Sequence, residues 1–288
     1  MSSAIFSWLR HRRFLWLAVI GLSGCTLFPP SPYQQVQHPL TFSAMQDLPS
    51  PNFDPRPQGG VIDMLVIHYT GMESAQGALS RLRDPAARVS AHYVIDEEGI
   101  VSRLVDENAR AWHAGKAAWR GETNINERSI GIELVNPGHE FGYRPFAEAQ
   151  MTALIGLTLD ILARHPIPPE NIVGHADVAP TRKQDPGELF DWARLARAGI
   201  GRWPGEWEKE GYISAAGLGP VDITEAQNLL ARIGYDIQVT GHRDPQTEKV
   251  LTAFQRHFRP RQVDGIADAE TLMRLRDLAG GGERAAIS

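Results

Sequence analysis

Residues 61–70 read V-I-D-M-L-V-I-H-Y-T, an apolar run that ends in three polar side chains. Such a run is typical of a buried strand, and the end of a strand is where a sheet presents ligands and polar groups. We therefore expect a strand over Val61–His68, with the imidazole of His68 at the edge of a sheet.

A second group of chemically versatile side chains lies far downstream, in G-H-A-D-V-A-P-T-R-K-Q-D-P-G at residues 174–187. Proline and glycine are frequent there, so we expect an irregular loop. Together with His68, the loop residues His175 and Asp185 form the donor set of an open zinc site, which keeps its fourth position for water. We therefore expect Zn²⁺ to be bound by His68, His175 and Asp185.

The segments around these two stretches alternate between strand and helix patterns. Asp96-Glu97-Glu98-Gly99 lies between two apolar runs and predicts a hairpin turn. The pattern favours an α/β fold with a mixed central sheet flanked by helices. We expect further strands over 91–96 and 129–135, a helix over 75–83 and an amphipathic helix over 147–165.

Several separated motifs occur in a fixed order: V-I-H-Y-T at 66–70, S-A-H-Y-V-I-D at 90–96, W-H-A-G at 112–115, N-E-R-S-I-G-I-E-L-V-N at 126–136, and the loop at 174–187. Together they resemble the type 2 zinc-dependent N-acetylmuramoyl-L-alanine amidases, which share a fold with peptidoglycan recognition proteins. The nearest subgroup in this resemblance is the lipoprotein amidases of the bacterial outer membrane. The resemblance implies a zinc amidase domain over residues 59–205, which hydrolyses the amide between N-acetylmuramic acid and L-alanine in peptidoglycan or muropeptides.

Glu133 interrupts the apolar run of a predicted buried strand, where an unpaired carboxylate is costly. The resemblance implies that it is a catalytic general base; the alternative is an edge strand with Glu133 pointing to solvent. Lys183 lies two residues before a metal ligand and would stabilise the oxyanion, because a fixed cation near the carbonyl lowers the barrier. The alternative for Lys183 is an exposed, solvated side chain.

Two further histidines lie within the matching motifs. His92 is implied to be a packing residue or an outer partner of the metal ligands, and neither His92 nor His113 has a carboxylate at ligand spacing in its own segment. The resemblance places His113 and Asn126 in contact with substrate.

The N-terminus has the pattern of a lipoprotein signal peptide over residues 1–24. A basic stretch at 10–13 precedes a short apolar run, and L-S-G then leads into Cys25, the only cysteine of the chain. We expect Cys25 to be lipidated and to anchor the protein to a membrane; the alternative is an ordinary signal peptide with a coincidental cysteine. Thr26, in place of an aspartate, favours the outer membrane, with the enzyme facing the periplasm of a Gram-negative bacterium. Residues 25–58 are rich in proline and predict a tether, part of which could pack on the domain.

The C-terminal region, residues 215–280, predicts three short helices that resemble the small peptidoglycan-binding domain of cell-wall hydrolases. One departure is Asp268-Ala269, where that family usually has Gly-Pro after D-G-x-x. We expect the domain to raise local substrate concentration without shaping the active site; the alternative is a helical appendage without a binding role.

The net charge of −5 argues against a nucleic-acid partner, because nucleic-acid-binding domains normally concentrate basic residues on one face. We expect a monomer. Two other functions stay open: a module of the same fold that binds muropeptides without cutting them, and a lipoprotein that only tethers the wall. The intact metal-ligand set, with Glu133 and Lys183, favours the enzyme.

Overall fold

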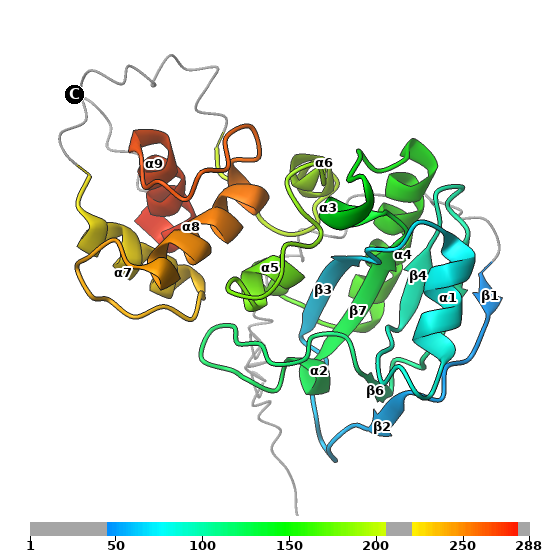
Figure 1. Cartoon of the computed structure of the whole chain (residues 1–288). Helices are drawn as coiled ribbons and strands as arrows, with labels where there is room; N and C mark the ends of the chain where they lie inside the picture. The colour runs from blue at the N-terminus through cyan, green and yellow to red at the C-terminus, as the bar shows by residue number, and fades with distance from the viewer. Residues whose placement is uncertain (1–44, 206–220, 282–288) are drawn as a thin grey trace, which may run out of the picture. The chain divides into compact units, whose positions relative to one another are not determined.

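The apolar run that ends at His68 forms strand β3 (Met64–Tyr69), which is buried from Met64 to His68. The computed structural model describes residues 45–205 and 221–281, drawn in colour in Figure 1. β3 belongs to a six-stranded sheet with the order β1-β5-β4-β7-β3-β8. The other strands of this sheet are β1 (Gln46–Asp47), β4 (Tyr93–Ile95), β5 (Val101–Arg103), β7 (Ser129–Leu134) and β8 (Ile172–Gly174).

The sheet is mixed, because β4 and β5 pair antiparallel while the other neighbouring strands run parallel. The predicted turn at 96–99 closes the β4–β5 hairpin: the Asp96 N–H donates to the Ile100 carbonyl at 3.2 Å. Gly99 has φ +81°, a conformation that glycine adopts without steric cost. The predicted α/β fold with a mixed central sheet is confirmed.

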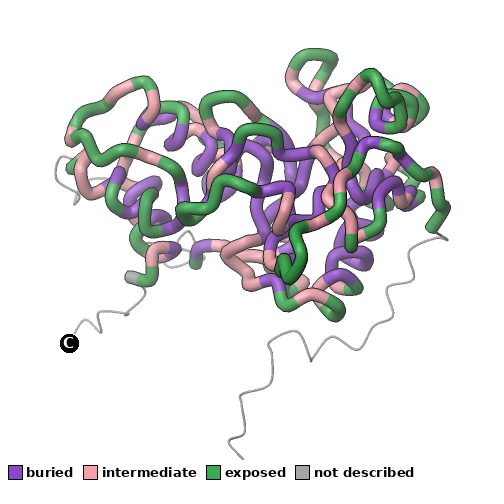
Figure 2. The backbone as a smooth tube through the Cα atoms, turned by 90° about the horizontal axis from the view of Figure 1, so that it is seen from below, coloured by how far each residue is buried: buried purple, intermediate pink, exposed green. Residues whose placement is uncertain are grey.

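Helices cover both faces of the sheet (Figure 1). α4 (Glu148–Arg164) and α6 (Trp192–Arg197) pack on one face, where they bury alternate strand residues such as Ile67 and Ile132. α1 (Ala75–Arg83) lies on the other face, where Leu82 meets Val94. Figure 2 shows the buried residues in the interior and the exposed ones in the outer segments. The predicted helices at 75–83 and 147–165 are therefore present, and the second begins one residue later and ends one residue earlier than predicted.

The last part of the expected tether packs against the body of the protein. β1 pairs with β5, and β2 (Phe53–Pro55) pairs with β6 (Ala109–Ala111) in a separate two-stranded sheet. Leu48 packs against the apolar cluster under α1. Of the range 25–58, residues from 45 onward thus belong to the folded domain, and the rest lies outside the described residues.

The C-terminal region forms the three predicted helices, α7 (Ile223–Ile233), α8 (Pro245–Phe258) and α9 (Ala269–Arg276), followed by a π-helical turn at Asp277–Gly281. Asp268, at the departure from the family pattern, caps α9 by accepting from the Thr271 N–H at 2.9 Å. An aspartate at this position satisfies a free backbone donor of the first turn. Within the described residues, the helices share an apolar cluster with the α/β domain and belong to the same compact unit, so they pack against it.

Candidate active site and metal centre

His68 and Glu133 come from adjacent strands and occupy the same face of the sheet. They are partners in the parallel β3–β7 register, His68 opposite Glu133. Side chains alternate between the faces of a strand, so the flanking residues Ile132 and Leu134 point into the core beneath α4 while Glu133 faces the other way. The register therefore brings the predicted base beside the first predicted metal ligand.

The composition of the glycine- and proline-rich segment at 174–187 predicted an irregular loop, but only part of the segment is irregular. Its first residues form a one-turn helix, α5 (His175–Val178), of which every residue is buried. The helix is possible because the prolines and the next glycine follow it, and the Asp177 carboxylate accepts from the Gly174 N–H at 2.7 Å and caps the turn. The expectation of a loop without helix is wrong for these four residues.

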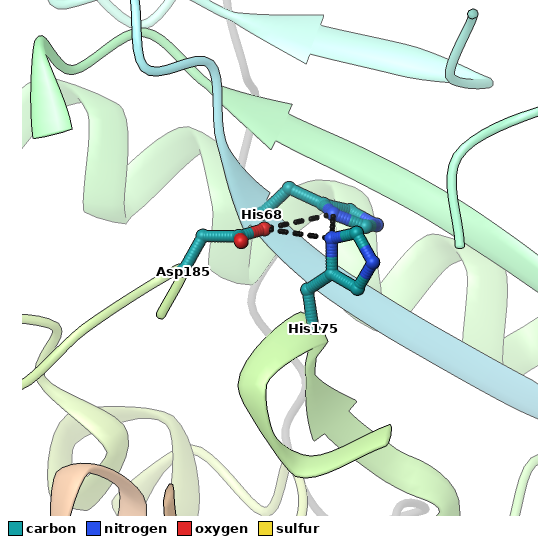
Figure 3. A group of neighbouring side chains, drawn as sticks. All are labelled: His68, His175 and Asp185. Atoms are coloured by element: carbon teal, nitrogen blue, oxygen red, sulfur yellow. Dashed lines mark hydrogen bonds and ion pairs between the residues drawn. The ribbon is translucent and has the colours of Figure 1, made fainter. Parts of the chain in front are cut away.

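The three predicted metal ligands converge on one point (Figure 3). His68 Nδ1 lies 2.9 Å from His175 Nδ1, and both nitrogens lie 3.0 Å from Asp185 Oδ2. Zinc bonds of about 2.0–2.1 Å place tetrahedral ligands about 3.3 Å apart. Two imidazoles and one carboxylate are also the donor chemistry of open zinc sites, so the residues fit this ion.

The tautomer of His175 is fixed from outside the cluster. Its Nε2 lies 3.0 Å from the carbonyl oxygen of Ala114, which only accepts, so Nε2 carries the proton. The lone pair of Nδ1 is then free to face the point where the ligands meet. Such backbone partners orient histidine ligands in metal sites.

A chain of hydrogen bonds orients His68 in the same way. The Ser129 hydroxyl donates to the Ile125 carbonyl at 2.6 Å, so its oxygen accepts from His113 Nε2 at 3.1 Å. His113 Nδ1 is then left to accept from His68 Nε2 at 3.1 Å. Burial, followed by the nearby His175, lowers the pKa of His68 to about 4, so the ring is neutral. A neutral ring with Nδ1 unprotonated is the form that binds metal.

Gly131 leaves space for the His113 ring, which links His68 to Ser129 by hydrogen bonds. A side chain there would meet the His113 ring at 2.5 Å. His113 is buried with 9% exposure and lines the cleft, so the geometry gives it a role in holding His68. Its contact with substrate stays a prediction.

Asn126 lies beneath the segment that carries His113. Its side-chain oxygen accepts from the backbone N–H groups of His113 and Ala114, at 3.2 and 2.8 Å. Asn126 therefore fixes the backbone whose Ala114 carbonyl orients His175, and substrate contact by Asn126 also stays a prediction.

His92 packs inside the fold, away from the metal ligands. Its Nδ1 accepts from the Gly131 N–H at 3.0 Å, and burial followed by Arg56 lowers its pKa to about 3. The Arg56 side chain donates hydrogen bonds to four backbone carbonyls, those of Glu107, Asn126, Glu127 and Ser129. Sequence reasoning missed Arg56 and Ser129, because neither has a local pattern that distinguishes it from a surface residue.

Glu133 is held in a poorly solvated position. Its Oε2 is buried and has no hydrogen-bond partner among the described residues. Burial raises the pKa of Glu133 well above its ordinary value, Asp185 raises it further, and Lys183 opposes both. A carboxyl group with a raised pKa and an unpaired oxygen is suited to accept a proton and to return it. The alternative of a solvent-facing Glu133 on an edge strand is excluded, since β7 lies between β3 and β4.

An open cleft of about 320 Å³ is lined by Glu133, His175 and Asp185. Lys183 is half-buried in its wall, and among the described residues no side-chain hydrogen bond or ion pair is recorded for it. Lys183 thus presents a cation, without an ion-pair partner among the described residues, to the same cleft as Glu133. The cleft is lined, besides these two, by residues such as Tyr69, Trp112, His113, His175, Arg182 and Asp185.

A buried His-His-Asp cluster with a carboxylate and a cation in one cleft is the arrangement of a metal-dependent hydrolase. Comparison with known proteins agrees. A family model described as N-acetylmuramoyl-L-alanine amidase matches residues 58–188, and one for a peptidoglycan binding domain matches residues 220–275.

The chain is also similar to individual amidases. The N-acetylmuramoyl-L-alanine amidase AmiD of Escherichia coli is 40% identical over 279 residues, which cover 90% of this chain and 95% of AmiD. The 1,6-anhydro-N-acetylmuramyl-L-alanine amidase AmpD of Haemophilus influenzae is 38% identical over 167 residues, 52% of this chain and 89% of AmpD. This chain belongs to the N-acetylmuramoyl-L-alanine amidase family and is a hydrolase of that class.

Solved structures match as well. A complex of AmiD from E. coli with anhydro-N-acetylmuramic acid-L-Ala-D-gamma-Glu-L-Lys has a TM-score of 0.67 at 43% identity and covers 77% of this chain and 91% of that one. The structure of AmpDh3 from Pseudomonas aeruginosa has a TM-score of 0.67 at 34% identity, with 75% and 91% covered. Both matches extend beyond the amidase region at residues 58–188, because each covers about three quarters of this chain.

Among residues 45–205 and 221–281, no helix combines the length and the apolar character needed to cross a bilayer.

Proposed function

We propose that this protein is a zinc-dependent amidase that cleaves the bond between the lactyl group of N-acetylmuramic acid and L-alanine in peptidoglycan or its fragments, in wall turnover or recycling. The observation that carries the proposal is the meeting of three buried ligand atoms within 3.0 Å of one another, beside the carboxyl group of Glu133, whose Oε2 has no hydrogen-bond partner among the described residues. Unpaired buried polar groups are rare unless they serve a function.

His68, His175 and Asp185 would hold the ion. Zinc in such a site supplies Lewis acidity, polarising the scissile carbonyl and making water a better nucleophile. The protein's own part is to orient both imidazoles, through the Ala114 carbonyl for His175 and through the hydrogen bonds of His113 and Ser129 for His68. These outer contacts fix the ligands before the ion arrives and so favour binding.

Glu133 acts as the proton carrier. It takes a proton from the attacking water as the new C–O bond forms at the lactyl carbonyl. It then gives this proton to the nitrogen of L-alanine as the C–N bond breaks. The products are the lactyl carboxylate and a peptide with a free amino group. The raised pKa of Glu133 suits both steps, because it makes the carboxylate a stronger base toward the attacking water, and the protonated group can then pass its proton to the leaving nitrogen.

Lys183 stabilises the negative charge that develops on the carbonyl oxygen. It lines the cleft from the same loop as Asp185, two residues before it. A cation held beside the developing negative charge lowers the free energy of the transition state.

The substrate class is inferred from the relatives. The AmiD complex contains an anhydro-muramoyl tripeptide, and AmpD is named for 1,6-anhydro substrates. An open cleft of about 320 Å³ can hold the bond together with part of a sugar and a peptide. We infer that this chain acts on muropeptides of this type, and that its C-terminal helices bind the polymer.

A recognition module that binds muropeptides without cutting them is the second candidate. Nothing in the cleft favours it, because the ligand set is complete and Glu133 and Lys183 both line the same space.

The location is proposed from the sequence alone. Cys25 lies outside the described residues, and its lipobox-like setting supports a lipid anchor on the outer membrane, with the enzyme facing the periplasm. We infer that the enzyme works as a monomer there.

The test is incubation of the purified, unlipidated protein with zinc and anhydro-N-acetylmuramic acid-L-Ala-D-gamma-Glu-L-Lys, followed by mass spectrometry. We expect two fragments, anhydro-N-acetylmuramic acid and the free tripeptide, together heavier than the substrate by one water. Saturable binding without fragments would identify the recognition module. Cleavage inside the peptide would assign the protein to another hydrolase class.

A further inference from the structure

Asp177 of α5 is joined to the C-terminal helices by two hydrogen bonds. The Tyr235 hydroxyl lies 2.6 Å from Asp177 Oδ1, and His257 Nδ1 lies 2.7 Å from Asp177 Oδ2. Tyr235 follows α7 and His257 belongs to α8. The catalytic domain and the C-terminal domain therefore meet at a charged group and not only at apolar side chains.

This contact is shielded from water. Asp177 is 1% exposed, Tyr235 3% and His257 4%. A carboxylate only accepts, so the hydroxyl and the ring nitrogen are the donors. Burial, followed by the Asp177 charge, raises the pKa of Tyr235 well above its ordinary value and keeps it a neutral donor. A buried carboxylate depends on its donors, because it has no water to replace them.

The same carboxylate holds the helix that begins with a metal ligand. Asp177 Oδ2 also accepts from the Gly174 N–H at 2.7 Å, directly before His175. The next residue, Ala176, donates its N–H to the Asp185 carbonyl at 2.8 Å. Asp177 thus fixes a one-turn helix that carries His175 and is bonded to the segment of Asp185.

Packing around the contact is dense. The His257 ring stacks between Trp192 and Phe258, with ring centroids 3.7 Å apart in each pair. Ala176 and Val178 of α5 share an apolar cluster with Leu230 and Phe254 of the C-terminal helices. Since packed interiors deform little, a shift of α8 would displace α5.

We propose that the C-terminal domain positions the metal site through Tyr235 and His257, which hold Asp177 and with it the helix that presents His175. The proposal rests on the proposed zinc amidase function. It changes the expectation that these helices only raise local substrate concentration. Tyr235, His257 and Asp177 are positioning residues, because they contact a ligand-bearing helix and not the substrate.

The expected effect is a loss of zinc affinity. Removal of an outer partner of metal ligands weakens metal binding by about 10- to 100-fold. We expect about tenfold for Tyr235→Phe combined with His257→Leu, the lower end, because these side chains act through the helix and not on the imidazole. Tyr235→Phe alone removes a single oxygen and should fold normally.

The test uses the full chain and measures the zinc dissociation constant by competition with a chromogenic chelator. Cobalt substitution adds a second readout, because the visible absorption bands of Co²⁺ report ligand geometry. His257→Asn is the matched rescue, since its side-chain amide can occupy the position of Nδ1 and donate to Asp177. Arg120→Ala is the matched control: Arg120 donates to the Ile233 carbonyl across the same interface, and among the described residues its side chain has no hydrogen bond to α5.

We expect weaker zinc binding and altered cobalt bands in Tyr235→Phe/His257→Leu, and values within about twofold of wild type in His257→Asn and Arg120→Ala. Wild-type affinity in the double variant overturns the positioning role. So does an equal loss in Arg120→Ala, which would indicate general loosening of the interface, or no recovery in His257→Asn. Absence of zinc binding by the wild-type chain would instead overturn the proposed function itself.

Discussion

His68 and Glu133 face each other across β3 and β7 as partners of one parallel register. The pairing brings a predicted metal ligand and a carboxyl group, 65 residues apart in the chain, to the same face of the sheet. Because both side chains are carried by buried strands and not by loops, their separation is fixed by backbone hydrogen bonds. Catalytic groups on rigid elements keep their geometry better than groups on loops.

Replacement of a metal ligand should remove the ion. His175→Ala or Asp185→Ala leaves two protein ligands for zinc, and we expect the metal content to fall from one ion per chain to near zero. Elemental analysis of the purified variants measures this, with His242→Ala as control, since His242 is exposed on the C-terminal domain. A variant that retains a full equivalent of zinc would remove its residue from the site.

Glu133→Gln should keep zinc and lose turnover. The amide has nearly the same shape as the carboxyl group but cannot accept and return the proton, so we expect a fall in kcat of about 10²- to 10⁴-fold. Zinc content and thermal unfolding of the same sample serve as controls. Turnover near that of wild type in a folded, zinc-loaded sample would exclude Glu133 as the base.

Lys183→Met should lower kcat without changing zinc content. Loss of one stabilising group at a developing oxyanion costs about 10²- to 10³-fold in rate. Lys249→Met, an exposed lysine on α8, is the matched control and should have little effect on a soluble substrate. Equal rates for both variants would show that Lys183 is a solvated side chain without a catalytic role.

Glu107 makes the stability of the fold dependent on pH. Burial alone would raise its pKa, but hydrogen bonds from Arg164, Tyr93 and His165 lower it to about 2. The ionised form is thus favoured by folding, so the stabilisation is complete above the ordinary value near 4.5 and is lost as pH falls from there to about 2. The difference corresponds to at most about 3 kcal/mol.

We therefore expect Glu107→Gln to lower the free energy of unfolding near pH 7 and to lose this effect as pH approaches 2. Urea unfolding at several pH values measures it. Asp160→Asn is the control, because Asp160 pairs with Arg164 at the exposed surface and should change the stability by less than about 1 kcal/mol. A Glu107→Gln effect that is constant across this pH range would contradict the role of the ion pair.

Cys25→Ala should release the protein from membranes. Cys25 is the only thiol in the chain, so no other residue can accept the lipid. Fractionation of cells that express wild type or Cys25→Ala compares membrane and soluble pools. Equal membrane retention of the two proteins would rule out the lipobox.

Much of the site could be predicted from local patterns. His68 ends a continuous apolar run, and Glu133 interrupts another. The sequence therefore predicts His68 at the end of one buried strand and Glu133 inside a second. The loop ligands were predicted from residue type and from a family resemblance. The ligand convergence confirms that these three residues meet.

The contacts that hold the ligands could not be predicted in this way. The chain from His68 through His113 to Ser129 depends on how β3, β7 and a connecting loop come together, and hydrogen bonds between distant segments leave no periodic signal. The short α5 helix was not predicted, because the frequent proline and glycine of the whole segment argue against a helix. A single turn needs only four residues without proline or glycine and a cap, which His175–Val178 and Asp177 provide. Which part of residues 25–58 packs on the domain was left open, because composition alone does not identify a partner such as the apolar cluster that Leu48 contacts.

The most direct measurement of the central claim is a zinc titration of the metal-free enzyme, with turnover of the anhydro-muramoyl tripeptide followed at each step. We expect no turnover without zinc, a linear rise with added ion, and a plateau at one equivalent per chain. Full turnover of the metal-free enzyme, or a plateau at two equivalents, would contradict the account of a single zinc site built by His68, His175 and Asp185.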